Sequence, residues 1–321
     1  MVVSAVTSVE PLGPWAASTR SRVVRTLARC AVRPLLTALP ATGPARVALR
    51  AFIAGPAVLD LLPGGPASLV RPSRTPAGEW ILPPGTPPRG GDVVLFLHGG
   101  GYVAGSARTY RAAMRLLAAE TGFPVLALDY RLAPEHPIPA ALDDALAAYE
   151  ILLGDGRPRP VHVVADSAGA HLAIEMLAEL ATRGAPGPRR MVLFSPVLDP
   201  ESPQADARDR SCPDPVVSPQ FVRRCVSAAR GGDPTGVTDA LSRLDGVADD
   251  SLPAVLSLLG DTECYADDTW RLHRRLDRAG VENRWRAMPG QIHSFLVFAR
   301  WLPEGRAAVV EAARFLRAGS P

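Results

Sequence analysis

The sequence predicts an α/β fold in which a largely parallel sheet is covered by helices on both faces. Two observations predict it. Short apolar runs alternate with amphipathic helical patterns between residues 93 and 316, and runs such as Val93–Leu97 lack a polar residue at every second position. The first pattern is typical of a parallel sheet and the second of a strand buried on both faces. With 321 residues, 47% of them hydrophobic, the chain has enough material for one large domain or two small ones.

The alternation predicts strands and helices in a regular order. The expected strands cover residues 93–97, 124–128, 161–165, 191–194, 254–259 and 283–287. The expected helices cover residues 106–120, 140–153, 168–180, 267–279 and 303–316. Short runs favour strands, whereas longer runs with an apolar residue about once per turn favour helices.

The N-terminal region stands outside this alternation. Residues 19–39 place apolar residues at helical spacing against an Arg-rich face, and they predict one or two helices ended by Pro40. Residues 45–62 predict another short helix. We expect residues 1–60 to form lid helices packed on the rest of the chain, with an Arg-rich helix on a membrane surface as the alternative.

A second irregular segment covers residues 199–244. It is rich in Pro, Asp and Arg, contains one helical pattern at 218–230, and is too long for a plain loop. We therefore expect a main α/β domain at 61–321 that carries residues 199–244 as an inserted part of the lid.

Composition argues against several classes of function. The net charge is +3, and all 35 basic residues are Arg, scattered among 32 acidic residues without an aromatic-studded basic stripe. Nucleic-acid binding is therefore not expected. The sequence shows no secretion signal and no apolar run of membrane-spanning length, so we expect a soluble, cytoplasmic protein without stable membrane insertion.

The four cysteines show no metal-ligand spacing, and no metal is expected. Free, mostly buried thiols in a reducing compartment are the simplest interpretation. The cysteines are Cys30, Cys212, Cys225 and Cys264.

One serine lies between an expected strand and an expected helix. The run Val161–Ala165 leads through Asp166 to Ser167, and small residues flank the serine. Such a strand–serine–helix turn is typical of a nucleophile elbow, which exposes the hydroxyl in a cleft. The usual pattern is Gly-x-Ser-x-Gly, and here Ala165 replaces the first glycine. By itself the pentapeptide is weak evidence, because small-residue turns after strands are common.

A glycine run, His98-Gly99-Gly100-Gly101, directly follows the strand expected at 93–97. Backbone N–H groups without side chains can point into a cleft and hold a developing oxyanion, and the N–H of Ala168 would be a further donor. A flexible turn or a phosphate-binding loop is the alternative. A phosphate loop should open a helix at once, however, and here other residues intervene.

A serine hydroxyl needs a base, normally an imidazole steadied by a carboxylate. Six histidines are candidates: His98, His136, His162, His171, His273 and His293. Only His293 lies after the last expected strand and before the last helix, where the order nucleophile, acid, base of α/β hydrolases places it.

Together these motifs resemble the hormone-sensitive lipase family of α/β-hydrolase carboxylesterases, over roughly residues 80–320. The segments that carry the resemblance are His98–Gly101, Asp129-Tyr130-Arg131-Leu132-Ala133-Pro134-Glu135-His136-Pro137, Asp166-Ser167-Ala168-Gly169 and Pro289–His293. The resemblance implies the α/β-hydrolase fold. That fold has an eight-stranded, mostly parallel sheet and a lid made of N-terminal helices and an insertion after the sixth strand.

The acid has two candidates. In the family it is usually an Asp at a fixed distance beyond a Leu-Pro pair, followed four residues later by another Asp. Counted from Leu252-Pro253, that position falls on Glu263, with Asp267 four residues later. Asp261 lies nearer the strand end but lacks the second Asp. We favour Glu263 and keep Asp261 as the alternative, since a glutamate can also orient and stabilise an imidazolium.

Other residues are expected to support the site. The resemblance implies that Tyr130, Arg131 and Glu135 brace the oxyanion loop, and His98 and Asp166 flank the two motifs as further supporting residues. Ser294 stands where the family usually has Gly after the histidine, so it is expected to hydrogen-bond near His293 or to line the pocket. Cys264 lacks an assigned base and is expected to be a packed thiol.

The leading hypothesis is a serine hydrolase that cleaves carboxylic esters through an acyl-enzyme, without metal or organic cofactor. Its partner would be a small-molecule ester or a related acyl compound. A tailoring enzyme on the same scaffold (lactone, acyl-transfer, elimination or cyclisation chemistry) is the first alternative, and a non-catalytic ligand receptor is the second. Dimers are common in the family that the chain resembles, so a homodimer is a further prediction.

Overall fold

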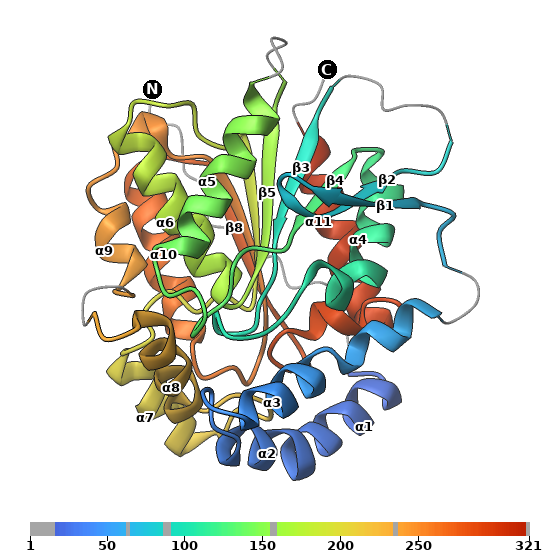
Figure 1. The fold of residues 1–321 in the computed structure, drawn as a ribbon, viewed down its shortest axis with the longest axis vertical. Coiled ribbons are helices and arrows are strands. Elements are labelled where there is room, and N and C mark those ends of the chain that lie inside the picture. Colours follow the sequence, from blue (N-terminus) through green and yellow to red (C-terminus); the bar gives the residue numbers. More distant parts are fainter. Residues whose placement is uncertain (1–16, 62–64, 86–90, 155–158, 234–236, 319–321) are drawn as a thin grey trace.

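The structure, a computed structural model, describes residues 17–61, 65–85, 91–154, 159–233 and 237–318. The first 16 residues of the predicted lid segment lie outside this part of the chain. A central sheet lies between two layers of helices, and more helices cross one end of it (Figure 1).

The sheet has eight strands and is mostly parallel. In chain order the strands are β1 (Leu69–Arg74), β2 (Ala77–Leu82), β3 (Val93–Leu97), β4 (Val125–Leu128), β5 (Val161–Asp166), β6 (Arg190–Phe194), β7 (Ala254–Gly260) and β8 (Asn283–Met288). Across the sheet they lie in the order β1-β2-β4-β3-β5-β6-β7-β8. β2 pairs antiparallel with β1 and β4, and all other neighbours pair in parallel. The carboxyl ends of β3 to β8 therefore meet at one edge, where open α/β sheets bind their ligands.

Helices cover both faces of this sheet. The covering helices are α4 (Ala107–Thr121), α5 (Ala140–Leu153), α6 (Ala168–Thr182), α10 (Ala266–Arg278) and α11 (Pro303–Arg317). Figure 1 shows α4 and α11 on one face and α5, α6 and α10 on the other. Strand β3 serves both layers: Val94 and Phe96 pack with α4 and α11, while Leu95 and Leu97 pack with α5 and α6. Because successive side chains of a strand point to opposite faces, both sets must be apolar.

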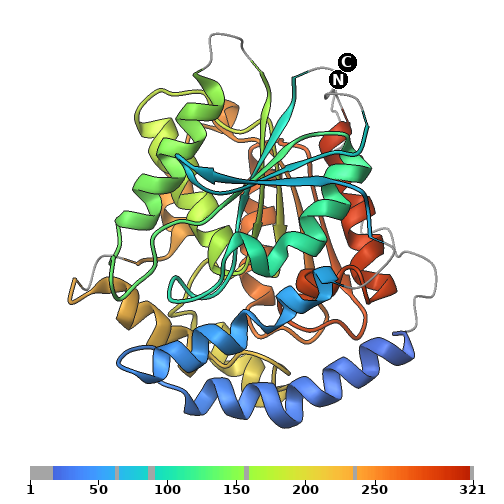
Figure 2. The same ribbon diagram turned by 45° about the vertical axis from the view of Figure 1, so that its right-hand side comes forward.

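Two groups of helices cross the carboxyl edge of the sheet (Figure 2). The N-terminal helices are α1 (Thr19–Leu27), the π-helical turn η1 (Ala28–Val32), α2 (Arg33–Ala38), α3 (Ala45–Ile53) and the 3₁₀ helix η2 (Gly55–Leu61). The inserted helices between β6 and β7 are α7 (Pro203–Ser211), α8 (Pro219–Arg230) and α9 (Ala240–Leu244). Ser18 joins α1 to the main domain, because its N–H and hydroxyl donate to Glu304 of α11 (2.6 and 3.1 Å).

The six strands and five helices predicted from the alternation between residues 93 and 316 are present with small shifts at their ends. The described residues also form two short 3₁₀ helices, η3 (Asp249–Ser251) and η4 (Phe295–Phe298). The β1–β2 hairpin was implied only by the resemblance, since β1 contains Pro72 and is exposed along most of its length. Helix α7 was not predicted, because it buries only Ala205 and so has no apolar stripe to detect.

Candidate active site

Ser167 lies on a sharp turn between β5 and α6. Its φ of 54° and ψ of −118° are strained for a residue that carries a side chain. Its N–H donates to the carbonyl of Phe194 at the end of β6 (2.9 Å), which fixes the turn to the neighbouring strand. This backbone geometry is that of a nucleophile elbow.

Close approach of the elbow to β3 requires a glycine at position 169. A Cβ there would lie 2.2 Å from the carbonyl oxygen of Leu97 and 2.7 Å from that of His98. Ala165, which replaces the usual first glycine, is fully buried in the layer below α5 and α6. Its methyl group is therefore accommodated in the core.

A continuous line of hydrogen bonds joins Ser167, His293 and Glu263. Oγ of Ser167 lies 2.8 Å from Nε2 of His293, and Nδ1 of His293 lies 2.9 Å from Oε2 of Glu263. The imidazole and the carboxylate are almost completely buried. The three residues come from loops after β5, β8 and β7, and the parallel strands bring them to one edge of the sheet.

Glu263, and not Asp261, is the carboxylate that contacts the imidazole. Its second oxygen, Oε1, accepts hydrogen bonds from the N–H of Gly260 (2.5 Å) and the hydroxyl of Ser195 (2.8 Å). The side chain of Asp261 is exposed instead. The extra methylene of glutamate allows the carboxylate to reach back from the turn to His293.

The charges around His293 favour its protonated form. Burial disfavours the imidazolium, but the charge and hydrogen bond of Glu263, together with the nearby carboxylates of Asp214 and Asp166, raise the pKa of His293 to about 9. The imidazole is thus a stronger proton acceptor than free histidine.

The glycine run adopts a conformation that side chains would block. Gly100 and Gly101 have φ values of 123° and 63°, and a Cβ on Gly100 would lie 2.2 Å from the carbonyl oxygen of Ala104. Both glycines line the same cavity as Ser167 and Ala168.

Gly99 has a different environment. A Cβ on it would lie 2.7 Å from both the carboxylate of Asp166 and the hydroxyl of Tyr110. Gly99 therefore allows the glycine run to pack against the buried end of β5, whereas its two successors face the cavity.

Tyr130 and His98 brace the start of the glycine run. The Tyr130 hydroxyl donates to the carbonyl of His98 (2.7 Å), and the two rings stack with centroids 4.1 Å apart. Nδ1 of His98 lies 2.8 Å from the carbonyl oxygen of Gly99. Burial lowers the pKa of His98 to about 4, so this ring is neutral at neutral pH.

The expected role of Arg131 needs correction. Its guanidinium pairs with Asp144 of α5 (2.8 Å) and donates to the carbonyl of Ala140 (3.3 Å), so it holds the start of α5 and not the glycine run. The side chain is about half exposed, because it faces outward from the segment that follows β4.

Glu135 connects the N-terminal helices to the segment after the glycine run. It pairs with Arg46 (3.0 Å) and Arg50 (2.7 Å), both on α3. Arg50 also donates to the carbonyls of Val103 (2.7 Å) and Ala133 (2.9 Å). The hydrogen bond from Arg50 is the main cause that lowers the pKa of Glu135 to about 2.

Sequence reasoning missed Ser195, which links two parts of the site. Its hydroxyl donates to Glu263 and accepts the N–H of Ser294 (3.0 Å). Ser195 directly follows β6, at the edge of the sheet that carries Ser167. Its position next to a strand end was the available signal, although it lies outside the motifs.

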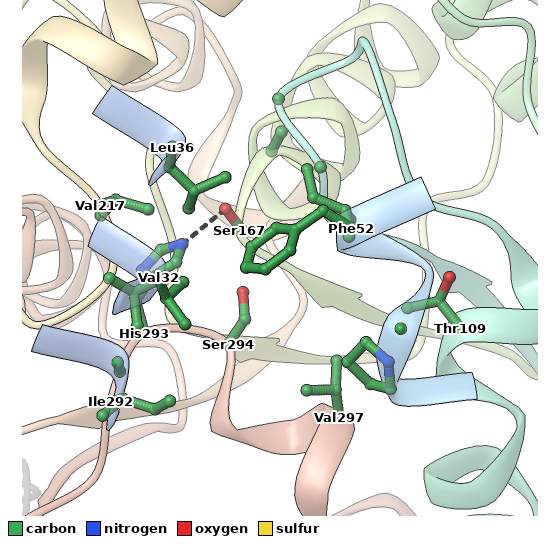
Figure 3. A pocket seen from close by; sticks show the side chains of 18 of the residues that line it. Val32, Leu36, Phe52, Thr109, Ser167, Val217, Ile292, His293, Ser294 and Val297 are labelled. Atoms are coloured by element: carbon green, nitrogen blue, oxygen red, sulfur yellow. Dashed lines mark hydrogen bonds between the residues drawn. The ribbon is translucent and has the colours of Figure 1, made fainter. Parts of the chain in front are cut away.

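An apolar cavity of about 710 Å³ opens above Ser167. The N-terminal helices contribute Val32, Leu36 and Phe52, and Val217 and Phe221 come from the inserted segment. In Figure 3 these helices bring apolar side chains over Ser167, and the dashed line marks its hydrogen bond to His293. Among the described residues that line the cavity there is no Asp, Glu or Arg.

The remaining histidines and the cysteines are not part of the hydrogen-bonded line from Ser167 to Glu263. His162, His171 and His273 are buried, whereas His136 is exposed. His171 lies 2.8 Å from both the Tyr102 hydroxyl and the carbonyl of Thr238.

Burial raises the pKa of the Cys264 thiol, as expected for a packed side chain. The prediction of mostly buried cysteines was half right, because Cys30 and Cys212 are exposed.

Within the ranges that the structure describes, no group of three or more His, Cys, Asp or Glu side chains is arranged to hold a metal ion. Nor do these ranges contain a helix with the length and apolar content needed to span a membrane.

Comparisons with known proteins agree with this fold. A family model described as alpha/beta hydrolase fold matches residues 94–297. The chain is 30% identical over 263 residues to an esterase of Acinetobacter venetianus, covering 79% of this chain and 84% of the relative. It is 35% identical over 243 residues to an acetyl-hydrolase of Streptomyces hygroscopicus, covering 74% and 79%.

The fold also matches solved structures over almost its full length. A crystal structure of an esterase from the bacterial hormone-sensitive lipase family aligns with a TM-score of 0.80 at 31% identity. The alignment covers 95% of this chain and all of the other one.

Proposed function

The chain belongs to the hormone-sensitive lipase family of α/β-hydrolase esterases, and on that premise we propose that it hydrolyses esters through an acyl-enzyme formed on Ser167. The observation that carries the proposal is the hydrogen-bonded line from Ser167 through His293 to Glu263. This line ends beneath an apolar cavity large enough for a small ester.

In the first half-reaction, Nε2 of His293 takes the hydroxyl proton while Oγ of Ser167 attacks the ester carbonyl. The tetrahedral intermediate then collapses, and the proton on His293 passes to the departing alcohol. In the second half-reaction, His293 takes a proton from water, which attacks the acyl-enzyme. The bond from the acyl carbon to Oγ of Ser167 then breaks, the acid leaves, and His293 returns the proton to Oγ. One ester and one water give one acid and one alcohol, so the cycle needs no cofactor.

The surrounding residues stabilise the charges that develop. The carboxylate of Glu263 holds the imidazole in the tautomer that accepts from Ser167 and stabilises the imidazolium that forms. The N–H groups of Gly100, Gly101 and Ala168 would hold the oxyanion, and each such donor contributes about 2.7–4 kcal/mol to transition-state stabilisation. Gly99 contributes by allowing the glycine run to pack on Asp166.

The helices over the site set the substrate class. Residues 19–60 and the 199–244 insertion act as a lid, because both contribute apolar side chains to the cavity. Since its described lining contains no charged carboxylate or guanidinium, the preferred ester has uncharged, apolar groups on the side that enters the cavity.

Replacement of Ser167 tests the proposal. Purified wild type and Ser167→Ala are assayed with a series of p-nitrophenyl esters of increasing acyl length. We expect Ser167→Ala to lose activity with every ester, while its thermal unfolding midpoint stays near that of wild type. Turnover by Ser167→Ala at the wild-type rate would refute the proposal.

Acyl transfer is the second candidate, and the apolar character of the cavity favours it. A site that admits few waters lets an added alcohol compete for the acyl-enzyme. Assays with p-nitrophenyl butyrate and increasing 1-butanol distinguish the two by the ratio of butyl butyrate to butyric acid. Butyric acid as the main product supports hydrolysis, and butyl butyrate at low alcohol concentration supports transfer.

A further inference from the structure

The peptide group between Glu263 and Cys264 is bonded at both ends by the inserted segment. The carbonyl of Glu263 accepts a hydrogen bond from Nε of Arg208 on α7 (2.7 Å). The N–H of Cys264 donates to Oδ2 of Asp214, in the loop between α7 and α8 (3.1 Å). Arg208 also donates to the carbonyl of Asp261 (3.1 Å), so the turn that carries Glu263 is fixed at three backbone atoms.

The side chain of Asp214 is itself held in place by hydrogen bonds. Its side chain is fully buried, and Oδ1 accepts hydrogen bonds from the N–H groups of Val216 (2.8 Å) and Val217 (3.1 Å). A buried carboxylate is stable only when such donors satisfy its oxygens. The contact of Oδ2 with the N–H of Cys264 joins this loop, which precedes α8, to the turn after β7.

The N-terminal helices brace the same loop from the other side. The guanidinium of Arg33, at the start of α2, pairs with Asp209 of α7 (2.7 Å) and donates to the carbonyl of Asp214 (2.5 Å). It also lies 3.2 Å from the carbonyl of Val217, which lines the cavity. Arg33, Asp214 and Glu263 therefore form a connected path from the lid to the candidate acid.

We propose that Asp214 and Arg208 are positioning residues that hold the Glu263–Cys264 peptide group from both ends and so aim the Glu263 carboxylate at His293. The proposal rests on the function proposed above. A glutamate has one more rotatable bond than the aspartate usual at this position, so its carboxylate depends more on a fixed backbone. Gly260 and Ser195 hold the carboxylate of Glu263 by hydrogen bonds, and Asp214 and Arg208 hold the peptide group that follows this residue.

Asp214 also acts through its charge. The carboxylates whose charges raise the pKa of His293 are Glu263 from the turn after β7, Asp214 from the insertion, and Asp166 from the end of β5. Arg33 is the guanidinium that faces Asp214, and burial raises the pKa of Asp214 itself to about 6. Above that pH the Asp214 charge favours protonated His293, so its removal should make His293 lose its proton at lower pH.

The test compares Asp214→Asn, Arg208→Met and wild type by steady-state hydrolysis of a p-nitrophenyl ester across pH 5 to 10. Loss of either contact should lower kcat by about 10- to 100-fold with little change in KM, since a small misplacement of the catalytic groups has an effect of that size. Asp214→Asn should also move the acid limb of the kcat/KM profile to lower pH. Arg208→Met tests the other end of the same peptide group if Asp214→Asn does not fold.

Asp268→Asn is the matched control. Asp268 is equally buried, but its carboxylate accepts its two backbone N–H bonds from Leu198 and Asp199 and not from the Glu263–Cys264 peptide group. We expect its pH profile to coincide with that of wild type. Wild-type kcat and an unshifted pH profile in both Asp214→Asn and Arg208→Met, while Ser167→Ala is inactive, would overturn the positioning roles alone. An active Ser167→Ala would instead overturn the proposed function.

Discussion

The hydroxyl of Ser294 donates a 2.6 Å hydrogen bond to Oδ2 of Asp166, the buried residue just before Ser167. Asp166 also accepts from the hydroxyl of Tyr110 (2.8 Å). Burial raises the pKa of Asp166 to about 6, although the charge of His293 and these two hydroxyls oppose the shift. Ser294 thus provides, at a position where the family usually has glycine, a donor for a carboxylate beneath the glycine run.

The hydrogen bond of the Ser294 side chain should stabilise the fold, whereas the backbone conformation of Ser294 should destabilise it. Its φ of 56° lies in the left-handed region, which is unfavourable for a residue with a side chain. Loss of the bond to a charged group in Ser294→Ala should lower the free energy of unfolding by about 2 kcal/mol. Ser294→Gly loses the same bond but relieves the strain, so it should be more stable than Ser294→Ala by about 1 kcal/mol. Denaturant unfolding measures both, and equal stabilities would show that the strain is absent.

The two candidate acids should respond very differently to substitution. Glu263→Gln keeps the shape of the side chain but loses the charge that stabilises the imidazolium, so kcat should fall by about 10³- to 10⁴-fold. Asp261→Asn is the control, because that carboxylate is exposed, and its kcat/KM should stay near that of wild type. A severe defect in Asp261→Asn together with an active Glu263→Gln would reverse the assignment.

Activity should rise with pH well above the range of an ordinary histidine. The base must be unprotonated to accept from Ser167, and the surrounding carboxylates raise the pKa of His293 to about 9. The kcat/KM of wild type should therefore increase from pH 7 towards pH 9. In Glu263→Gln the residual activity should reach its plateau at lower pH, because the main charge that favours the imidazolium is gone. If the acid limb of the wild-type kcat/KM profile had its midpoint near pH 6.5, the surrounding carboxylates would not raise the pKa of His293.

Gly169 should tolerate no side chain. Gly169→Ala places a methyl group 2.2 Å from the carbonyl oxygen of Leu97, so the elbow must move away from β3. We expect a loss of about 3 kcal/mol in the free energy of unfolding and little remaining activity. Gly246→Ala is a matched control, because a Cβ on Gly246 would lie 3.5 Å from its nearest neighbour, the carbonyl oxygen of Arg243. It should change stability by less than about 0.5 kcal/mol, and equal effects of the two substitutions would argue against a close approach at the elbow.

Much of the fold could be predicted because each core strand and helix shows its own pattern of apolar residues in the sequence. A strand buried on both faces, such as Val93–Leu97, needs an unbroken apolar run, and α6 needs an apolar residue about once per turn. The β1–β2 hairpin could not be recognised in this way. It lies at the edge of the sheet, and the burial pattern of β1 leaves most of its residues exposed.

The site was predictable only where its chemistry follows a motif. Ser167 and His293 have positions fixed by the order of strands, and the structure brings them within hydrogen-bond distance. Ser195 and Asp214 lie in no motif and act through contacts between segments distant in sequence. The side chain of Arg131 was assigned to the wrong neighbour, because sequence places it beside Tyr130 but does not show that it turns outward to Asp144.

Direct detection of the acyl-enzyme is the most direct test of ester hydrolysis through Ser167. Wild type mixed with p-nitrophenyl butyrate and quenched in acid should gain the mass of one butyryl group, and peptide mapping should place it on Ser167. Ser167→Ala treated in the same way should show no added mass and no turnover. An acyl group on another residue, or ester turnover without Ser167, would contradict the account.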